Sequence, residues 1–357
     1  MEALLSRSRP CYSWLHRLLV LAVSFTVLQS VGAQDLRFGG RVPPEVETIY
    51  ENGIAWLAEN QKPDGSWSGG NQGAGATGLG VMALLSSGED PNFGRYAPNI
   101  RRGLRNIIAQ QDGKTGYIPS TMYHHGFAML TLAEAYGAVD DTLLWQSAEK
   151  ENSEGDATGR TIAEALQLAI RGAVTSQKKN PQGGWRYSPD DAGADTSVVG
   201  SVMIGLLAAR NAGMDVPDEA LDTGHEYMRR NTGSNGYVAY YNFGGAGGES
   251  MARSSVATLV SAIGKQKDTD EYKATLEHIS SRLEAKESGH PYYFLYYMAQ
   301  ALFQGDYESW EKWNAATIRK LESQQLDNGS YGNDAYRTSM SLLSLALNYR
   351  FLPIYER

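Results

Sequence analysis

A motif that returns along the chain constrains its fold more than any other feature of the sequence. Each copy holds, in order, a small or apolar residue, a glutamine, a glycine and an aromatic residue. The three clear copies are Leu57, Gln61, Gly65 and Trp67; Ala173, Gln177, Gly183 and Trp185; and Leu321, Gln325, Gly329 and Tyr331. Weaker copies lie at residues 111–117 and 232–237, and the spacing places one more unit around residues 282–293. A recurring motif of this kind predicts a fold built from one repeated structural unit.

The segments on the two sides of the motif differ in polarity. Those after it are apolar and rich in small residues, at positions 77–87, 125–136, 196–209, 253–263, 292–303 and 338–349. Those before it are polar and amphipathic, as in residues 45–59, 100–111 and 161–176. Both kinds have helical periodicity, whereas the alternation typical of strands is confined to residues 237–241. The sequence therefore predicts an all-α fold of six helical hairpins.

Two populations of helix predict two layers. Nearly apolar helices suit an inner ring and amphipathic helices an outer ring, so six hairpins would close into an α/α toroid. An open solenoid is the alternative, and it would need atypical polar units at its ends. Both terminal units keep a clear motif, which favours closure. We expect one toroid domain over residues 45–357, after a linker at 34–44 and with an acidic insertion at about 138–159.

The motif is expected to be structural, because a repeated element is rarely the unique reacting group of a protein. Its glycines would permit the tight turn after the first helix. Its glutamines would satisfy backbone groups at the terminus of a neighbouring helix. Its aromatic residues, together with Trp56 in the first copy, would cover the junctions between units.

The first 33 residues have the pattern of a secretory signal peptide. Basic residues come first, an apolar run spans residues 18–31, and the small residues Gly32 and Ala33 follow. The run is too short for a comfortable membrane span, so we expect cleavage near Gln34 and export, with no membrane span in the mature chain. An uncleaved N-terminal anchor is the alternative. Cleavage would remove Cys11, the single cysteine, and with it any disulfide or thiolate chemistry.

The composition excludes several kinds of ligand. The formal net charge is −8, with acidic and basic residues interspersed, which argues against a nucleic-acid partner. No cofactor or metal is indicated, because the adjacent side chains of His124 and His125 diverge by about 100° on a helix. The glycine run at 244–248 lacks the lysine that ends a phosphate-binding loop. Tyrosines (21) far outnumber phenylalanines (8), so many aromatic side chains would meet water or a polar group.

Together with Gly53 and Trp56, the first motif copy resembles the QW motif of the triterpene cyclase and protein prenyltransferase superfamily. The resemblance extends over residues 45–357 at the level of the repeat. It implies an α/α toroid whose inner helices surround a central, largely apolar cavity, and the length matches one such barrel. Residues 349–355 are also similar to the ending of exported bacterial proteins described as prenyltransferase and squalene-oxidase repeat proteins.

The chemistry of that superfamily depends on residues that this chain lacks. Its cyclases use the middle aspartate of D-x-D-D-T-A as the proton donor, but Ala194 stands at that position, before Asp195 and Thr196. Asp195 is predicted to cap the following helix instead. The prenyltransferases bind zinc with a cysteine, and the complement-type proteins that share the toroid form a thioester with one. No cysteine stays in the mature chain, and His290 is expected to be a loop or capping residue.

The resulting hypothesis is an exported toroid that binds a terpenoid or lipid-like ligand in its central cavity. The residues at or near the starts of the inner helices would line one mouth of that cavity: Thr77, Tyr123, His124, His125, Asp195, Thr196, Glu249, Arg253, His290, Tyr292, Tyr293, Arg337 and Thr338. An enzyme of this kind would be cyclase-like or prenyltransferase-like, with Asp195 as a non-standard acid. One alternative is a scaffold or interaction protein whose inner side chains fill the cavity. Another is a carbohydrate-active helical barrel, with Asp190, Asp191, Asp195 and Glu249 as candidate acids.

Overall fold

A computed structural model describes residues 42–68, 73–145, 159–241, 248–287, 289–352 and 354. The predicted signal peptide at 1–33, residues 34–41 of the linker and residues 146–158 of the acidic insertion lie outside the described residues. The described residues hold thirteen α-helices and one 3-10 turn, and they hold no strand. The expected extended piece near Tyr237 amounts to an isolated bridge between Thr232 and Val238. No helix in this part of the chain is long and apolar enough to cross a membrane.

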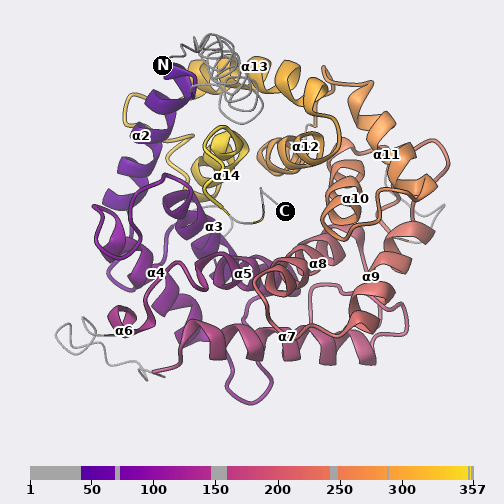
Figure 1. Cartoon of the computed structure of the whole chain (residues 1–357), viewed down its shortest axis with the longest axis horizontal. Coiled ribbons are helices and arrows are strands. Elements are labelled where there is room, and N and C mark those ends of the chain that lie inside the picture. The colour runs from indigo at the N-terminus through magenta and orange to yellow at the C-terminus, as the bar shows by residue number, and fades with distance from the viewer. Residues whose placement is uncertain are drawn as a thin grey trace, which may run out of the picture. The chain divides into compact units, whose positions relative to one another are not determined.

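From Pro44 onward the described helices form one compact unit of two concentric rings. The outer ring consists of α2 (Pro44–Glu59), α4 (Ala97–Gln110), α7 (Ile162–Lys179), α9 (Asp218–Arg230), α11 (Asp270–Ser280) and α13 (Tyr307–Gln324). The inner ring consists of α3 (Ala74–Leu85), α5 (Met122–Ala135), α8 (Thr196–Asn211), α10 (Met251–Ile263), α12 (Pro291–Gly305) and α14 (Ala335–Leu345). Figure 1 shows the inner helices nearly end-on, surrounded by the outer ones. The short helix α6 (Asp141–Leu144) and the 3-10 turn η2 (Ala346–Asn348) complete the fold.

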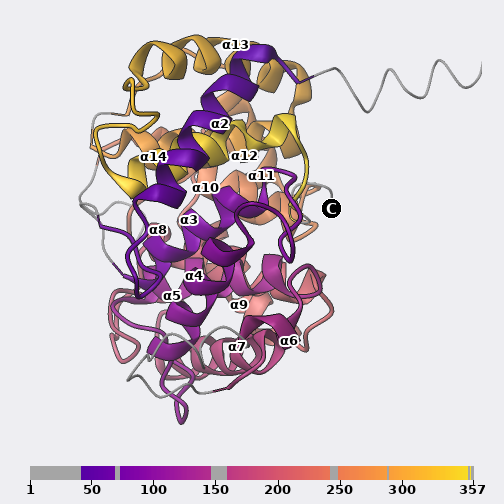
Figure 2. The same cartoon turned by 90° about the vertical axis from the view of Figure 1, so that its left-hand side faces the viewer.

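The first and last hairpins meet, so the ring is closed. Helix α14 packs on α3 and α2, and α13 packs on α2. The side chain of Gln325 donates to the carbonyl of Ile49 at 2.9 Å, across 276 residues of sequence. In the view turned by 90°, α2 and α4 run in front of the inner helices (Figure 2). The predicted all-α toroid is confirmed, and an open solenoid is excluded.

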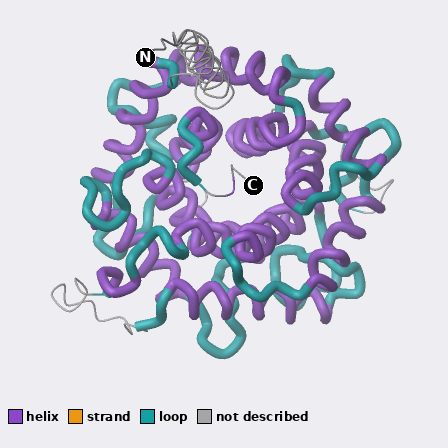
Figure 3. Tube along the Cα trace, in the orientation of Figure 1, coloured by secondary structure: helices purple, strands orange, loops and turns teal. Residues whose placement is uncertain are grey.

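The inner helices are rich in small residues because other helices surround them. Every residue of α3 is buried. A Cβ at Gly126 of α5 would lie 2.5 Å from the backbone of Ser201 in α8, so these two helices approach to backbone contact. The outer helices bury one face only, as Ile100, Leu104 and Ile108 do along α4. Loops join the two rings at the helix ends (Figure 3).

The glutamines of the motif link each unit to the next. Gln61 donates to the carbonyls of Gly65 and of Asn99 in α4, each at 2.9 Å. Gln177 makes the matching pair of bonds to Gly183 and Ala220, and Gln325 to Gly329 and Ile49. Gln111, in a weak copy, bonds to Gly116 and Ala165. The acceptor lies within the first two turns of the next outer helix, so the glutamines do bond near the terminus of a neighbouring helix, but to carbonyls rather than to the unpaired N–H groups of its first turn.

The aromatic residues of the motif seal the same junctions. The indole nitrogens of Trp67 and Trp185 donate to the carbonyls of Leu57 and Ala173, at 2.7 and 2.9 Å. Tyr331 donates to Leu321 in the corresponding way, at 3.0 Å. All three side chains are buried, and so is Trp56 on α2. The ring of Trp67 lies against Gly80 of α3, where a Cβ would be only 3.0 Å from it.

Candidate functional site

All six inner helices begin at the same end of the ring, which we call the N-terminal rim. Side chains of Thr121, Asp195, Ser250 and Asp334 each accept a hydrogen bond from a backbone N–H in the first turn of the helix that they precede. The loops before these helices also meet. The N–H of Met122 donates to the carbonyl of Tyr187 at 2.8 Å, and the N–H of Thr196 to that of Tyr240 at 2.9 Å.

Aromatic side chains from opposite inner helices meet across the centre of the ring. We call Tyr123, Tyr293, Tyr297 and Tyr336 the tyrosine cluster. The ring centroids of Tyr123 and Tyr293 are 6.1 Å apart, and those of Tyr293 and Tyr297 are 4.5 Å apart. Helices α5 and α12 stand on opposite sides of the inner ring (Figure 1), so these contacts span it. One layer further along α5, Phe127 contacts Tyr296 and Tyr297, with centroids 6.2 and 6.5 Å apart. Aromatic rings thus occupy the middle of the toroid at these two levels.

The hydroxyls of the tyrosine cluster are neutral; Tyr293 and Tyr297 are buried, and Tyr123 and Tyr336 are half-buried. Burial raises the pKa of Tyr123 and Tyr297 well above the ordinary tyrosine value, and raises the pKa of Tyr336 to about 12. The hydroxyl of Tyr293 lies close to Ser197 of α8 and to the hydroxyl of Tyr297. Neither Tyr293 nor Tyr297 completes a hydrogen bond of normal geometry, although both hydroxyls are buried.

Asp195 lies at the edge of this cluster, and it caps α8 as the sequence predicts. Its Oδ1 accepts from the N–H of Val198 at 3.0 Å. Its Oδ2 is buried without a hydrogen bond of normal geometry, although the hydroxyl of Tyr240 lies close to the carboxyl, and the residue is 1% exposed. Burial raises the pKa of the Asp195 carboxyl, while the Val198 N–H and the guanidinium of Arg186 oppose that rise. The charge of Asp195 in turn contributes to the raised pKa of Tyr293, which shows that α8 and α12 share this part of the rim.

Several other predicted site residues bond to the backbone instead. His125 is fully buried: its Nδ1 accepts from the N–H of Ile118, and its Nε2 donates to the carbonyl of Ala169 on the outer helix α7. His124 accepts from the N–H of Gly75 on α3 at 3.2 Å. Thr196 donates to Ala239 and Thr338 to Asp334, and Thr77 is buried within α3. These side chains tie elements together around the rim.

The charged candidates are spread around the rim. The carboxylate of Glu249 pairs with Nε2 of His278 in α11 at 3.0 Å, and therefore faces the outer ring. Arg253 donates to the carbonyl of Val238 at 2.9 Å, and His290 is exposed at the start of α12 without a side-chain cap bond. The guanidinium of Arg337 covers the ring of Tyr292 at 5.8 Å. The described residues contain no group of three or more His, Cys, Asp or Glu side chains that could hold a metal ion.

Among the described residues, the buried carboxylates are Asp195 and Glu134. Glu134 lies on α5 eleven residues after Tyr123, about 16 Å along the helix at 1.5 Å per residue. These two acids are therefore at opposite ends of the ring. Asp190 and Asp191 lie in the loop before α8, where Asp190 pairs with Lys179 at 3.3 Å and Asp191 accepts from the N–H of Ser188 at 2.8 Å.

Sequence reasoning missed Tyr297, Tyr336, Tyr240 and Glu134. A signal was present for two of them: Tyr297 follows Tyr293 by one helical turn, and Tyr336 precedes Arg337 at the start of α14 as Tyr292 precedes Tyr293 on α12. Tyr240 and Glu134 carry no local signal, because their contacts come from distant segments.

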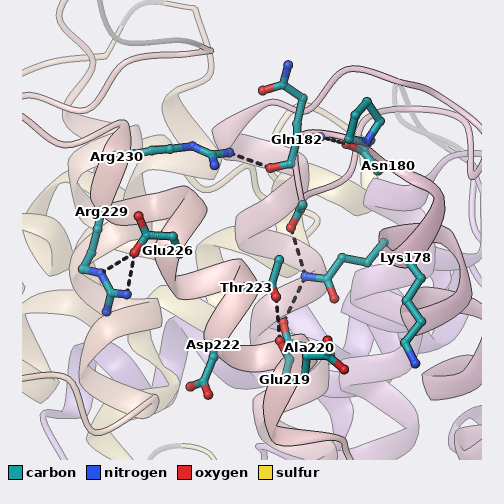
Figure 4. Close-up of a pocket in the computed structure, with 13 residues that line it drawn as sticks. Lys178, Asn180, Gln182, Glu219, Ala220, Asp222, Thr223, Glu226, Arg229 and Arg230 are labelled. Carbon is teal, nitrogen blue, oxygen red and sulfur yellow. Dashed lines mark hydrogen bonds and ion pairs between the residues drawn. The ribbon is translucent and has the colours of Figure 1, made fainter.

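A groove on the outer surface is separate from the rim. It has a volume of about 650 Å³ and lies between the end of α7, the loop after it and α9 (Figure 4). Its lining is part polar and part apolar. Arg229 pairs with Glu226 at 2.7 Å, and Arg230 donates to the carbonyl of Gln182 at 2.6 Å. Lys178, Glu219 and Asp222 also line the groove.

Solved structures with the same fold include enzymes that act on very different molecules. An inactive variant of the alpha-1,6-mannanase GH76A of Salegentibacter sp. HEL1_6, in complex with alpha-1,6-mannotriose, has a TM-score of 0.60 and 13% identity, over 86% of this chain and 99% of that one. The type II terpene cyclase MstE from Scytonema has a TM-score of 0.59 and 15% identity, over 86% and 99%. A variant of MstE in complex with geranylgeranyl dihydroxybenzoate has a TM-score of 0.58 and 16% identity, over 86% and 98%. At these identities the likeness establishes the α/α toroid fold.

Comparison at the level of sequence places the chain in a family. No curated protein matches it. A family profile described as "Domain of unknown function (DUF6288)" matches residues 46–302, which span five of the six hairpins apart from the last turn of α12. The chain therefore belongs to the DUF6288 family.

Proposed function

We propose that the N-terminal rim binds a largely apolar, terpenoid or lipid-like molecule that carries one neutral oxygen group. The observation that carries this proposal is that three buried polar atoms near the N-terminal rim lack a hydrogen bond of normal geometry: Oδ2 of Asp195 and the hydroxyls of Tyr293 and Tyr297. A purely structural interior pairs its buried polar atoms, since an unpaired one is destabilising by about 1–3 kcal/mol. A ligand oxygen would supply the missing partner.

The electrostatics of the rim favour a neutral ligand. The tyrosine hydroxyls stay protonated at physiological pH, and the raised pKa of Asp195 favours its protonated form. The two phenols can donate to a hydroxyl or carbonyl oxygen of the ligand, and Oδ2 of Asp195 can accept from a ligand hydroxyl. The rings of Tyr123 and Phe127 would contact its apolar part.

Hydrolysis of a glycosidic bond has less support from the residues, although a mannanase shares the fold. That reaction uses two carboxyl groups about 5–10 Å apart across the scissile bond. The buried carboxylates in the described part of the chain, Asp195 and Glu134, lie at opposite ends of the ring. Proton-initiated cyclisation also lacks support, because Ala194 occupies the place of the cyclases' donor and one oxygen of Asp195 is engaged as a helix cap.

Geranylgeraniol is a suitable probe, because it joins an isoprenoid chain to one hydroxyl. We expect it to bind the protein in a calorimetric titration, mannotriose to produce no heat, and squalene to be recovered unchanged. Tyr293→Phe should weaken geranylgeraniol binding about 2–10-fold, the effect of losing one neutral hydrogen bond. Tyr272→Phe removes a hydroxyl from a buried tyrosine of the outer helix α11 and is the matched control.

Three outcomes would overturn the proposal. Binding of mannotriose alone would favour the carbohydrate alternative. Equal binding by wild type and Tyr293→Phe would place the ligand elsewhere. Failure of geranylgeraniol to bind, together with the absence of any lipid in an organic extract of the natively purified protein, would leave the scaffold function.

We also propose that the protein acts outside the cytoplasm, as the basic, apolar and small residues of positions 1–33 predict. The mature N-terminus is then expected near Gln34. N-terminal sequencing of the natively expressed protein tests this, and an intact Met1 on a soluble cytoplasmic form would contradict it.

A further inference from the structure

The last described residues pass over the end of the ring opposite the N-terminal rim, which we call the C-terminal rim. After α14 and η2, Tyr349 contacts Tyr50 of α2, with ring centroids 5.0 Å apart. Phe351 then lies against Gly88, three residues beyond the end of α3. The N–H of Ile354 donates to the carboxylate of Glu134 near the end of α5, at 3.2 Å. This segment therefore passes from the end of α14, by the end of α3, to the end of α5.

The segment is packed into the protein. Leu352 is 2% exposed and Ile354 is 5% exposed. Their neighbour Glu134 is also buried, at 3% exposure. A buried carboxylate needs donors, because losing its hydration without replacement is strongly unfavourable. The N–H of Ile354 supplies one of them.

The position of Glu134 places this contact beneath the aromatic layer. Tyr123, Phe127 and Glu134 are spaced at four and seven residues on α5, so they lie along one stripe of that helix. The first two side chains point toward α12 across the ring. Glu134 follows the same direction, because its charge contributes to the raised pKa of Tyr296 on α12. The C-terminal segment thus covers the far end of the column of aromatic side chains.

We propose that Tyr349–Leu352 and Ile354 form a cap that closes the C-terminal rim, so that a ligand reaches the tyrosine cluster from the N-terminal rim alone. The closure itself is independent of any ligand, whereas the direction of access rests on the function proposed above. At the N-terminal rim, Tyr187 and Tyr241 are 49% and 38% exposed, and the hydroxyls of Tyr187 and Tyr240 pair at 2.8 Å. The C-terminal rim exposes Tyr136 and Phe351 to a similar degree, so what distinguishes that end is the burial of Leu352 and Ile354 over it.

Single-cysteine labelling tests the closure without a ligand. In a Cys11→Ser background, Leu130→Cys places a thiol between Phe127 and Glu134 on the stripe of α5 described above, at a position that is 1% exposed. We expect a maleimide to label it slowly in the full-length chain. Ending the chain after Tyr349, or replacing Leu352 by Glu, should raise the labelling rate about tenfold or more, as local opening replaces rarer global opening. The Leu352→Glu variant keeps the test available where the shortened chain fails to fold.

A matched thiol distinguishes opening of the rim from general loosening. Leu104 is fully buried on the face of α4 that packs against the inner ring, and Leu104→Cys makes the same change of leucine to cysteine there. Its labelling rate should stay unchanged in both altered chains. The cap is refuted by an unchanged rate at Leu130→Cys in the Leu352→Glu protein, and equally by rates that rise together at both thiols.

Blocking each rim in turn tests the direction of access. A polyethylene glycol maleimide attached at Tyr187→Cys should slow the association of geranylgeraniol at least several-fold, whereas the same group at Phe351→Cys should leave it unchanged. The reverse pattern, or no effect at either position, would overturn the proposed direction. Failure of geranylgeraniol to bind the unmodified protein would refute the proposed function, and the labelling rates would still decide whether the cap exists.

Discussion

The two oxygens of Asp195 lie in different surroundings, and this decides what the residue can do. Oδ1 caps the start of α8, and the capping residues of three other inner helices have the same role. Oδ2 is buried at the edge of the tyrosine cluster without a hydrogen bond of normal geometry. The cap could be predicted from an aspartate that precedes an apolar helix. The raised pKa could not, because it comes from burial of the carboxyl among segments that are distant in sequence, such as the one that holds Tyr240, 45 residues away.

Asp195→Asn should become more stabilising as the pH rises. The raised pKa means that the folded protein holds this proton above pH 3.8, the ordinary value, where the unfolded chain releases it. The wild type therefore loses stability as the pH rises from 3.8 through the raised pKa, whereas asparagine stays neutral and still caps the helix. Urea denaturation between pH 4 and pH 8 measures the difference. Parallel stability curves for the two proteins would contradict the prediction, and Asp195→Ala should lie about 0.5–2 kcal/mol below Asp195→Asn throughout.

His125 should make the protein sensitive to acid. Burial lowers its pKa from 6.5 to about 4, because the charged imidazolium loses its hydration, and this outweighs the hydrogen bond to the carbonyl of Ala169, which raises the pKa. Its Nδ1 accepts from the N–H of Ile118 in the folded protein. The unfolded chain binds that proton below pH 6.5, so stability falls as the pH drops from 6.5 toward 4, by about 3 kcal/mol in total. In His125→Gln this slope should shrink. It should not vanish, because the pKa of His225 is also lowered to about 4. An unchanged slope in His125→Gln would show that His125 is charged in the folded protein.

At the scale of the element, the motif sets the distance between neighbouring units. The five glycines Gly65, Gly116, Gly183, Gly236 and Gly329 all have a positive φ, and each abuts the next outer helix. Two of them lie in the weak copies of the motif, so the turn is kept where the glutamine or the aromatic residue varies. The number and order of the hairpins could be predicted from the sequence for this reason. The aromatic contacts between α5 and α12 could not, because the inner helices have no polar face that shows which residues point inward.

Gly65→Ala should be much more destabilising than Gly213→Ala. Both glycines have a positive φ, so both substitutions carry the backbone strain of about 1 kcal/mol. A Cβ at Gly65 would also overlap with the carbonyl of Arg102 in α4, whereas a Cβ at Gly213 has nothing within 4 Å. We expect Gly65→Ala to lower the free energy of unfolding by about 2–4 kcal/mol in total. Equal losses in the two variants would mean that the motif glycine serves the turn alone.

For the whole molecule, closure of the ring makes the two ends of the domain interdependent. The first outer helix, α2, contacts both α13 and α14, and Gly329 lies against Asn52 of α2 as Gly65 lies against α4. Closure could be predicted because both terminal units carry the full motif. The course of the C-terminal segment could not, since no periodic pattern marks Leu352 and Ile354, and the contacts that place the segment are with distant residues: Phe351 with Gly88 and Ile354 with Glu134.

Gln325→Ala should therefore destabilise the protein about as much as Gln177→Ala. Each substitution removes one bond within its own turn and one bond to the next outer helix, to Ile49 for Gln325 and to Ala220 for Gln177. Two lost hydrogen bonds correspond to about 1–3 kcal/mol. Their positions differ in one respect: Gln177 joins consecutive hairpins, whereas Gln325 joins the two ends of the domain. Amide hydrogen exchange should rise in α2 for Gln325→Ala and in α9 for Gln177→Ala. In a closed ring, losing the bond between Gln325 and Ile49 loosens α2, which lies on the other side of that junction. An exchange rate in α2 that stayed at the wild-type value in Gln325→Ala would therefore show that the last hairpin does not hold the first in solution.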